Sequence, residues 1–267
     1  TGYVPYPNPD KNDGYHNEGA GQTLEYAYQD WCLSQMAKKM GVDDDVIIFS
    51  GRAKNYRNLW DETSGWMRPK SINDGWNESF NPLLSHHGFV ESTAAQSTWF
   101  VPHDLAGLFN LMGGSEKAAE KLNRQFLIAN SHDFISKPFK SDRFVHNALR
   151  NTYLNYGNQP SMQVGFIFNY AGKPWLTQYW TREVVERIYS HLDPENGYNG
   201  DEDQGLMGSL AVLLKLGLFE MRGGAAIKPI YEIGSPIFDK VTIKLNKDYY
   251  NGNEFVIETR NNSSNNR

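Results

Sequence analysis

The sequence predicts a mainly α-helical chain with a short β region at its C-terminal end. Apolar residues recur at helical spacing in about seven segments separated by loops. After Gly223-Gly224 the pattern changes to an alternation of apolar and polar residues, which is typical of strands. Helices that alternate with long loops favour antiparallel helix pairs arranged in an arc or toroid.

The N-terminal half begins with twenty residues rich in Pro, Gly and Asn, which are expected to be extended. A first helix is expected from Thr23 to Met40, where Gly41 provides a C-terminal stop. A second is expected from about Asp43 to Leu59. The turn-rich passage over residues 61–83 is too long for an ordinary connection, which indicates a functional loop or a lid.

Five further helices and three strands are expected in the rest of the chain. Ser115 is expected to be the N-cap of one helix, and Gly113-Gly114 ends the helix before it. The strands are expected over 227–233, 241–245 and 255–257. The helices are expected at about Ala94–Met112, Ser115–Ala129, Asp142–Tyr156, Thr177–Leu192 and Asp203–Leu218.

Composition narrows the possible functions of these 267 residues. The hydrophobic content of 39% supplies a sizeable core. A net charge of −5 argues against a nucleic-acid partner, and the sequence has no apolar run of about 18 residues that would span a membrane. The single cysteine, Cys32, excludes an internal disulfide and a cysteine-rich zinc site. The aromatic content of 13% suits a large core and a sugar-binding surface alike.

Two acidic positions at loop-to-helix junctions are the main catalytic candidates. One is Glu91 and the other is the run Asp201-Glu202-Asp203. Two carboxyl groups facing each other across a pocket are the minimal apparatus for glycoside hydrolysis. Acids at helix starts are more often caps, and the acidic run also suits a calcium ion, although it lacks EF-hand spacing. These residues by themselves leave the three alternatives open.

Six blocks of sequence carry a resemblance to a known family. In chain order they are TLEYAYQDW, RAKNYRNLWDETSGWMRP, ESTAAQSTWFVPHDLAGLFNLMGG, YGNQPSMQVGFIFNYAGKPWLTQ, GDEDQG and YEIGSPIFDKVTI. Together they resemble the C-terminal part of the calcium-dependent exo-acting α-mannosidases of glycoside hydrolase family 92. The resemblance implies that residues 1–224 form part of an (α/α)6 barrel. It also implies that residues 225–267 form a β-strand segment packed on a β-sandwich that this chain lacks.

The resemblance further implies a role for individual residues. In an inverting hydrolysis of terminal α-linked mannose, Glu91 is the general acid and Asp203, helped by Asp201, is the base. Calcium is expected near the sugar, with Gln159 and Asp203 among its ligands. Trp66 and Trp76, in the long loop, are candidates for sugar stacking. The expected substrate-binding residues are Gln96, Trp66, Trp76, His86 and His87.

Several positions depart from the family pattern and keep a second function open. Ala95 and Ser97 stand where the motif has Trp and Tyr, Gln159 replaces a glutamate, Met162-Gln163 replaces a His pair, and Leu206 replaces a glutamine. A calcium shell that loses a carboxylate binds the ion more weakly. The alternative is therefore a weakened relative that binds carbohydrate or has a structural role, with a purely helical scaffold as a third possibility. The retained acids favour the hydrolase.

The expected barrel is incomplete, because about seven helices are found where twelve are needed. Such a fragment exposes apolar helix faces, so we expect a second chain or a missing N-terminal segment to complete the barrel and the sandwich. The expected ligand is a mannose-containing glycan, and the resemblance implies a secreted, periplasmic or cell-surface location. His103 is expected to make a structural hydrogen bond, and Trp99, Trp175 and Trp180 are assigned to the core.

Overall fold

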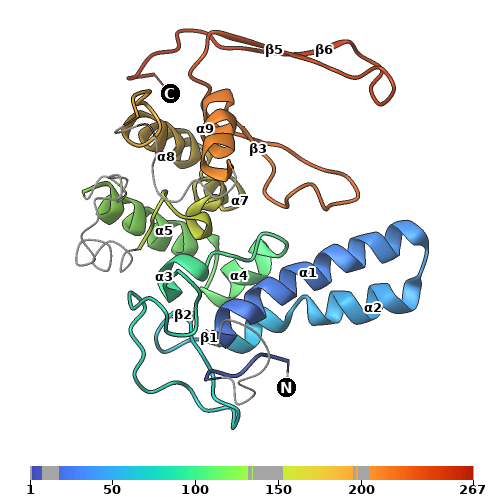
Figure 1. The fold of residues 1–267 in the computed structure, drawn as a ribbon, viewed down its shortest axis with the longest axis vertical. Helices are drawn as coiled ribbons and strands as arrows, with labels where there is room; N and C mark the ends of the chain where they lie inside the picture. The colour runs from blue at the N-terminus through green and yellow to red at the C-terminus, as the bar shows by residue number, and fades with distance from the viewer. Residues whose placement is uncertain are drawn as a thin grey trace.

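The protein is mainly helical, as predicted, and its strands form small two-stranded sheets (Figure 1). The computed structural model describes residues 2–7, 18–131, 134, 153–194, 197 and 205–266. Its α-helices are α1 (Gly19–Met40), α2 (Asp43–Arg52), α3 (Ala94–Ser97), α4 (Leu105–Leu111), α5 (Ser115–Asn130), α7 (Ile167–Tyr170), α8 (Pro174–Arg187) and α9 (Leu206–Leu216). Short 3-10 helices are η1 (Asn55–Leu59), η3 (Gln159–Ser161) and η4 (Val164–Phe166).

Helices α1 and α2 form an antiparallel pair (Figure 1). Gly41 ends α1 in the left-handed conformation, with φ 76°, as the sequence predicts. The single helix expected from Asp43 to Leu59 is wrong, because α2 ends at Arg52 and the chain resumes as η1. The carbonyl oxygen of Ala53 accepts a hydrogen bond from His103 Nε2 at 2.9 Å. The contact helps to hold the turn at which α2 ends.

The helix expected over Ala94–Met112 is two helices, α3 and α4. Pro102 lies between them, has no N–H to donate to a helix, and favours a break. Asp104 then begins α4 as its N-cap, because its Oδ1 accepts a hydrogen bond from the N–H of Gly107 at 3.0 Å.

The later helices agree with the sequence in position and differ at their ends. The N-cap of α5 is Gly114 and not Ser115, because the cap has φ 116°, which glycine adopts without strain. Helix α8 begins three residues earlier than expected, with Pro174 in its first turn, and ends at Arg187. Gly217 ends α9 with φ 70°.

The helix expected over Asp142–Tyr156 lies mostly outside the described residues. Its end, residues 153–156, is not helical. Here the N–H of Asn155 donates to Ser161 Oγ at 2.9 Å, and the N–H of Gly157 donates to Asn155 Oδ1 at 2.9 Å. These side chains take the place of helical carbonyl acceptors.

The C-terminal β region forms two antiparallel pairs. Its strands are β3 (Leu218–Phe219), β4 (Glu232–Ile233), β5 (Lys240–Lys244) and β6 (Glu254–Glu258), whereas β1 (Trp60–Asp61) and β2 (Trp66–Met67) pair with each other earlier in the chain. Strand β3 pairs with β4, and β5 pairs with β6 so that Thr242 lies opposite Val256. Of the strand expected over 227–233, only β4 forms, whereas the other two expected strands are confirmed. The β5–β6 hairpin projects from one end of the molecule (Figure 1).

Arg182 joins α8 to the C-terminal segment. The residue is only 5% exposed, and its guanidinium group donates hydrogen bonds to the carbonyl oxygen of Pro236 at 2.8 Å and to Asn262 Oδ1 at 3.0 Å. A buried guanidinium group needs such partners, because leaving it unpaired is costly. The segment is therefore fixed to the helices at this point.

Aromatic side chains fill the core beneath α5 and α8. Trp180 stacks on Phe126 with ring centroids 5.0 Å apart, and its Nε1 donates to Asn123 Oδ1 at 2.7 Å. Trp99 is also fully buried and donates to Gln125 Oε1 at 2.6 Å. The core assignment of Trp175 is wrong, because this residue near the start of α8 is 56% exposed.

The described residues contain helix pairs but no closed ring of helices, so the (α/α)6 barrel stays a prediction. The boundary between residues 1–224 and 225–267 also stays a prediction. None of the helices in the described ranges is long and apolar enough to cross a lipid bilayer.

Candidate active site

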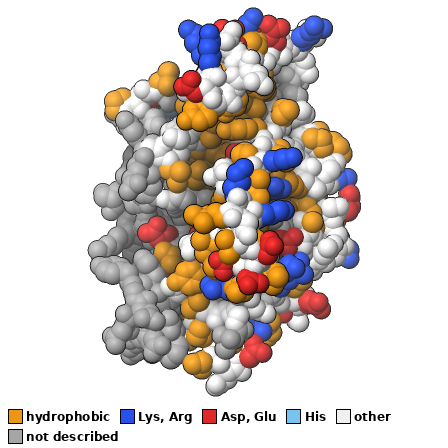
Figure 2. Space-filling view, turned by 90° about the vertical axis from the view of Figure 1, so that its right-hand side faces the viewer, with side chains coloured by type: hydrophobic (Ala, Val, Ile, Leu, Met, Phe, Trp, Pro, Cys, Tyr) orange, Lys and Arg blue, Asp and Glu red, His pale blue; other side chains and the backbone are white. Residues whose placement is uncertain are grey.

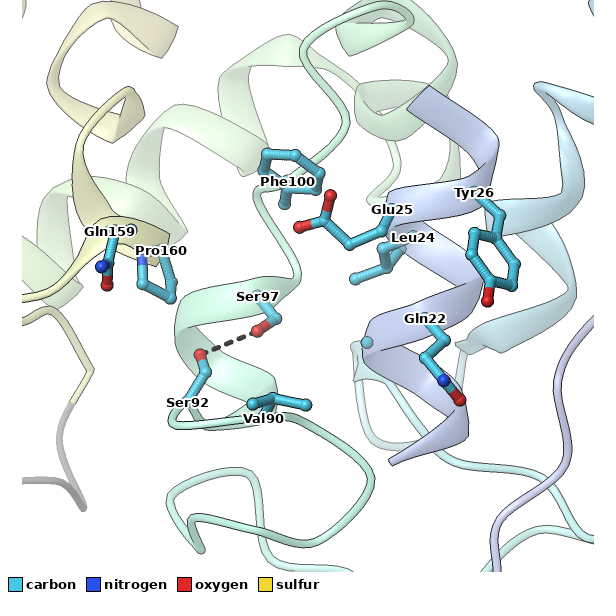
Figure 3. A pocket seen from close by; sticks show the side chains of 11 residues that line it. Gln22, Leu24, Glu25, Tyr26, Val90, Ser92, Ser97, Phe100, Gln159 and Pro160 are labelled. Atoms are coloured by element: carbon cyan, nitrogen blue, oxygen red, sulfur yellow. Dashed lines mark hydrogen bonds between the residues drawn. The ribbon is translucent and has the colours of Figure 1, made fainter. Parts of the chain in front are cut away.

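A cavity of about 390 Å³ lies between α1, α3 and η3 (Figure 3). Its size falls in the range of small-ligand pockets. Helix α1 supplies one wall, and the others come from α3 with the residues on either side of it and from the start of η3. The lining residues are Gly21, Gln22, Leu24, Glu25, Tyr26, Val90, Ser92, Ser97, Phe100, Gln159 and Pro160.

Backbone contacts hold the loop before α3 against the first turn of α1. The N–H of Gly21 donates to the carbonyl oxygen of Gly88 at 2.8 Å. Gly88 itself has φ 86°, and a Cβ atom there would overlap the ring of Pro69. Only glycine fits this position without strain. The close approach places Val90 and Ser92 on the cavity wall.

Glu91 lies between Val90 and Ser92, two residues that line this cavity, but it is not itself among the lining residues. Its side chain is exposed, and its backbone has φ 47°, which is uncommon for a residue other than glycine and is often found at functional sites. The Nδ2 atom of Asn158 donates to the backbone oxygen of Glu91 at 2.6 Å. The structure thus brings the expected acid close to the loop that carries Gln159.

The first turn of α3 is fixed by hydroxyl groups. Thr93 is the N-cap and accepts a hydrogen bond from the N–H of Gln96, while Ser92 Oγ and Ser97 Oγ are 2.8 Å apart (Figure 3). Gln96 is only 1% exposed and does not line the cavity, although Ser97 does. The expected sugar contact of Gln96 stays a prediction.

Glu25, which is not among the site residues predicted from the sequence, faces the cavity from α1. Its carboxylate points toward Phe100 (Figure 3). Burial raises the pKa of this carboxyl group, although the side chain is exposed at the cavity mouth. Glu25 belongs to the sequence block TLEYAYQDW, but helical spacing alone does not tell which side of a helix faces a ligand.

The other expected substrate-binding residues are not among those that line this cavity. Trp66 has the Nζ atom of Lys121 over its ring at 3.4 Å, and Trp76 has that of Lys70 at 4.6 Å. His86 Nδ1 is 3.8 Å from Glu18 Oε1. None of the three, nor His87, lines the cavity. The amino groups of Lys121 and Lys70 therefore lie over one face of each tryptophan ring, and the expected sugar contacts of these four residues stay predictions.

The burial of the Lys121 amino group beside Trp66 can be tested through the pH dependence of stability. Burial lowers its pKa from 10.5 to about 7, and its amino group donates to the carbonyl oxygen of Gly65. Between about pH 7 and 10.5 the unfolded chain binds more protons at this lysine than the folded one does. The free energy of unfolding is therefore expected to rise with pH in this window.

We expect Lys121→Met to remove this part of the pH dependence, measured by denaturant unfolding of the complete protein at several pH values. Lys117→Met, on the exposed side of the same helix, is the control and should leave the dependence unchanged. Parallel pH profiles of the wild type and Lys121→Met would contradict the depressed pKa.

His103 has a structural position, as expected. It packs edge-on against Tyr56, in addition to its bond to Ala53, and burial lowers its pKa. The neighbouring Asp104 Oδ2 accepts from Tyr56 OH at 2.7 Å and from Arg57 Nη2 at 3.0 Å. Both residues therefore fix the turn before α4.

Asp201 and Asp203 lie outside the described residues, so their distance from Glu91 stays open. Helix α9 begins at Leu206, shortly after them. Within the described ranges, no three His, Cys, Asp or Glu side chains gather as a metal site would require. Gln159 offers a single amide oxygen beside the cavity, which does not by itself make a calcium site.

Comparison with known proteins gives one consistent result. The model of the glycosyl hydrolase family 92 catalytic domain matches residues 1–267. An uncharacterized secreted glycosidase of Arthroderma benhamiae is 27% identical over 91% of this chain and 31% of its own length. The chain therefore spans about a third of that relative.

Solved structures give the same result. The family GH92 α-mannosidase BT3965 of Bacteroides thetaiotaomicron is 29% identical, with a TM-score of 0.76 over 98% of this chain and 31% of its own. A second structure of it contains mannoimidazole. The inverting mannosidase BT2199 of the same organism is 32% identical, with a TM-score of 0.77 over 98% of this chain and 34% of its own. The chain belongs to glycosyl hydrolase family 92.

Proposed function

We propose that the complete protein hydrolyses terminal α-linked mannose from glycans, with the cavity beside Glu91 as part of its sugar-binding site. The observation that carries the proposal is this cavity, in a chain whose fold matches mannosidases, one of them solved with mannoimidazole. A mannose ring has several hydroxyl groups and one apolar face, and the cavity offers Ser92, Gln159 and the ring of Phe100.

In the proposed mechanism Glu91 is the general acid. Its protonated carboxyl group gives a proton to the glycosidic oxygen as the bond from that oxygen to the anomeric carbon breaks. A water molecule attacks the opposite face of the same carbon, and Asp203, positioned by Asp201, takes its proton. Inversion requires room for this water, so the two carboxyl groups are expected to lie about 6.5–9.5 Å apart.

Calcium is a further part of the proposal. Gln159 would hold the ion through its amide oxygen, and carboxylates would have to come from Asp203 and its neighbours. Bound calcium would supply positive charge that orients sugar hydroxyl groups. Because Gln159 is neutral, we expect a weaker site than one with glutamate at that position.

A glycan-binding protein without turnover is the second candidate. Ser97 lines the cavity where the family motif has an aromatic residue, and Gln159 lines it where the motif has a carboxylate. Both changes remove groups that hold a sugar or an ion, while the cavity itself is kept.

We also propose that further polypeptide covers the α1–α2 pair and that the protein is secreted, as the fungal relative is described to be. Large apolar side chains are exposed on this pair, and Figure 2 shows apolar groups interleaved with charged ones on that face. A patch of this kind is typical of a surface that another segment covers. The exposed residues are Leu33, Met36, Met40, Val42, Ile47 and Ile48.

The function is tested by incubating the complete protein with α-linked mannobiosides and measuring released mannose. We expect release that falls when a calcium chelator is added and recovers with added Ca²⁺. Release that is unchanged by chelation would contradict the calcium part alone. Glycan binding without any release would favour the second candidate.

A further inference from the structure

Glu25 supplies the only carboxyl group among the described residues that line the cavity. It lies in the second turn of α1, and its side chain extends from the helix into the space between α1 and α3 (Figure 3). Gln22 lies one turn earlier on the same wall. The start of η3, with Gln159, faces them from the other side of the cavity (Figure 3).

No described residue forms a hydrogen bond or an ion pair with the Glu25 carboxylate. A carboxylate accepts hydrogen bonds only, and it has two oxygens with about four lone-pair sites. Carboxylates that cap or stabilise a helix are bonded to N–H groups or to a cation, as Asp104 is bonded to Gly107 and Arg57. Glu25 has no such contact among the described residues, and it lines the cavity, so its oxygens are left to accept hydrogen bonds from water or from a ligand there.

The surroundings of Glu25 complement a sugar ring. The hydroxyl groups of a sugar donate hydrogen bonds, which an ionised carboxylate accepts more strongly than a neutral group does. The ring of Phe100 lies beside the carboxylate and offers an apolar surface for the C–H face of the sugar (Figure 3). Acceptor and apolar surface thus lie on the same side of the cavity.

We propose that Glu25 is a sugar-binding residue, whose carboxylate accepts hydrogen bonds from hydroxyl groups of the mannose ring held in the cavity. This inference rests on the proposed function, because it names a contact of the same site. Glu25 fixes the position of the ring so that the glycosidic oxygen meets Glu91. It gives no proton and takes none in the reaction.

The test compares the complete wild-type protein with Glu25→Gln and Glu25→Ala, using calorimetry with mannoimidazole as the probe. Glu25→Gln keeps the size of the side chain and removes its charge, so it is expected to bind the probe at least tenfold more weakly, about 1.4 kcal/mol. Glu120→Gln, an exposed glutamate on α5, is the matched control and should bind as the wild type does. Thermal unfolding shows whether each variant is folded, and Glu25→Gln carries the test if Glu25→Ala does not fold.

The results separate this inference from the proposed function. A wild type that releases mannose, together with Glu25→Gln of unchanged probe affinity and unchanged KM, would overturn the role of Glu25 and leave the function standing. Tenfold weaker binding by Glu25→Gln and a raised KM would support it. A wild type that neither releases mannose nor binds the probe would overturn both.

Discussion

Replacing Glu91 with glutamine is expected to lower kcat/KM for an α-linked mannobioside by about 10²–10⁴-fold. Glutamine is nearly the same size but has no proton to give to the leaving oxygen, so the departing sugar would leave as an alkoxide. The loss is to be measured on the complete protein by mannose release. It is expected to be the largest effect of any single substitution at the described residues of the site.

The leaving group provides an internal control for this prediction. A dinitrophenyl mannoside needs little help from an acid, because its leaving oxygen is already a weak base. We therefore expect Glu91→Gln to lose much less activity on this substrate than on the mannobioside. Full activity on the mannobioside would remove Glu91 from the role of acid. An equal loss on both substrates would indicate damage to the site as a whole.

Gly107→Ala is expected to lower the free energy of unfolding by about 3 kcal/mol or more. Gly107 lies in the first turn of α4, and a Cβ atom there would overlap Asp104 Oδ2 and Tyr56 OH. The overlap would separate the carboxylate from the tyrosine and the arginine that it bonds. The measurement is thermal unfolding of the complete protein.

Gly51→Ala is the matched control, because Gly51 lies in α2 and a Cβ atom there would meet nothing within 4 Å. Alanine is favoured over glycine in a helix, so this variant is expected to gain up to about 1 kcal/mol. If Gly107→Ala unfolded at the same temperature as the wild type, the packing described around Asp104 would be wrong.

Much of the fold was predictable because helical spacing and capping residues are local. The stop at Gly41 and the body of α5 follow from such patterns. The break at Pro102 was also present in the sequence, yet the continuous apolar pattern concealed it. The end of α2 did not follow from such local patterns, and the turn there is held in part by a hydrogen bond between Ala53 and His103, which lies in a distant segment.

The site was predictable only in part, because it too depends on contacts between segments that are distant in the sequence. The resemblance selected Glu91 and Gln159, and the structure brings their loops together through Asn158. It did not select Glu25, because the direction of a side chain into a cavity depends on how helices pack. The stacking of Trp66 on a sugar stays a prediction. Lys121 from α5 lies over one face of its ring, a contact between residues 55 positions apart that spacing does not reveal.

We propose that Glu91 and Asp203 face one mannose ring held in the cavity between α1 and α3. A crystal structure of the complete protein with mannoimidazole tests it most directly. We predict the ligand beside Phe100, with the Glu91 carboxyl group at hydrogen-bonding distance, about 2.6–3.2 Å, from the ligand atom that replaces the glycosidic oxygen. Asp203 should lie on the opposite face of the ring. A ligand bound elsewhere, or a Glu91 side chain turned away from it, would contradict the claim.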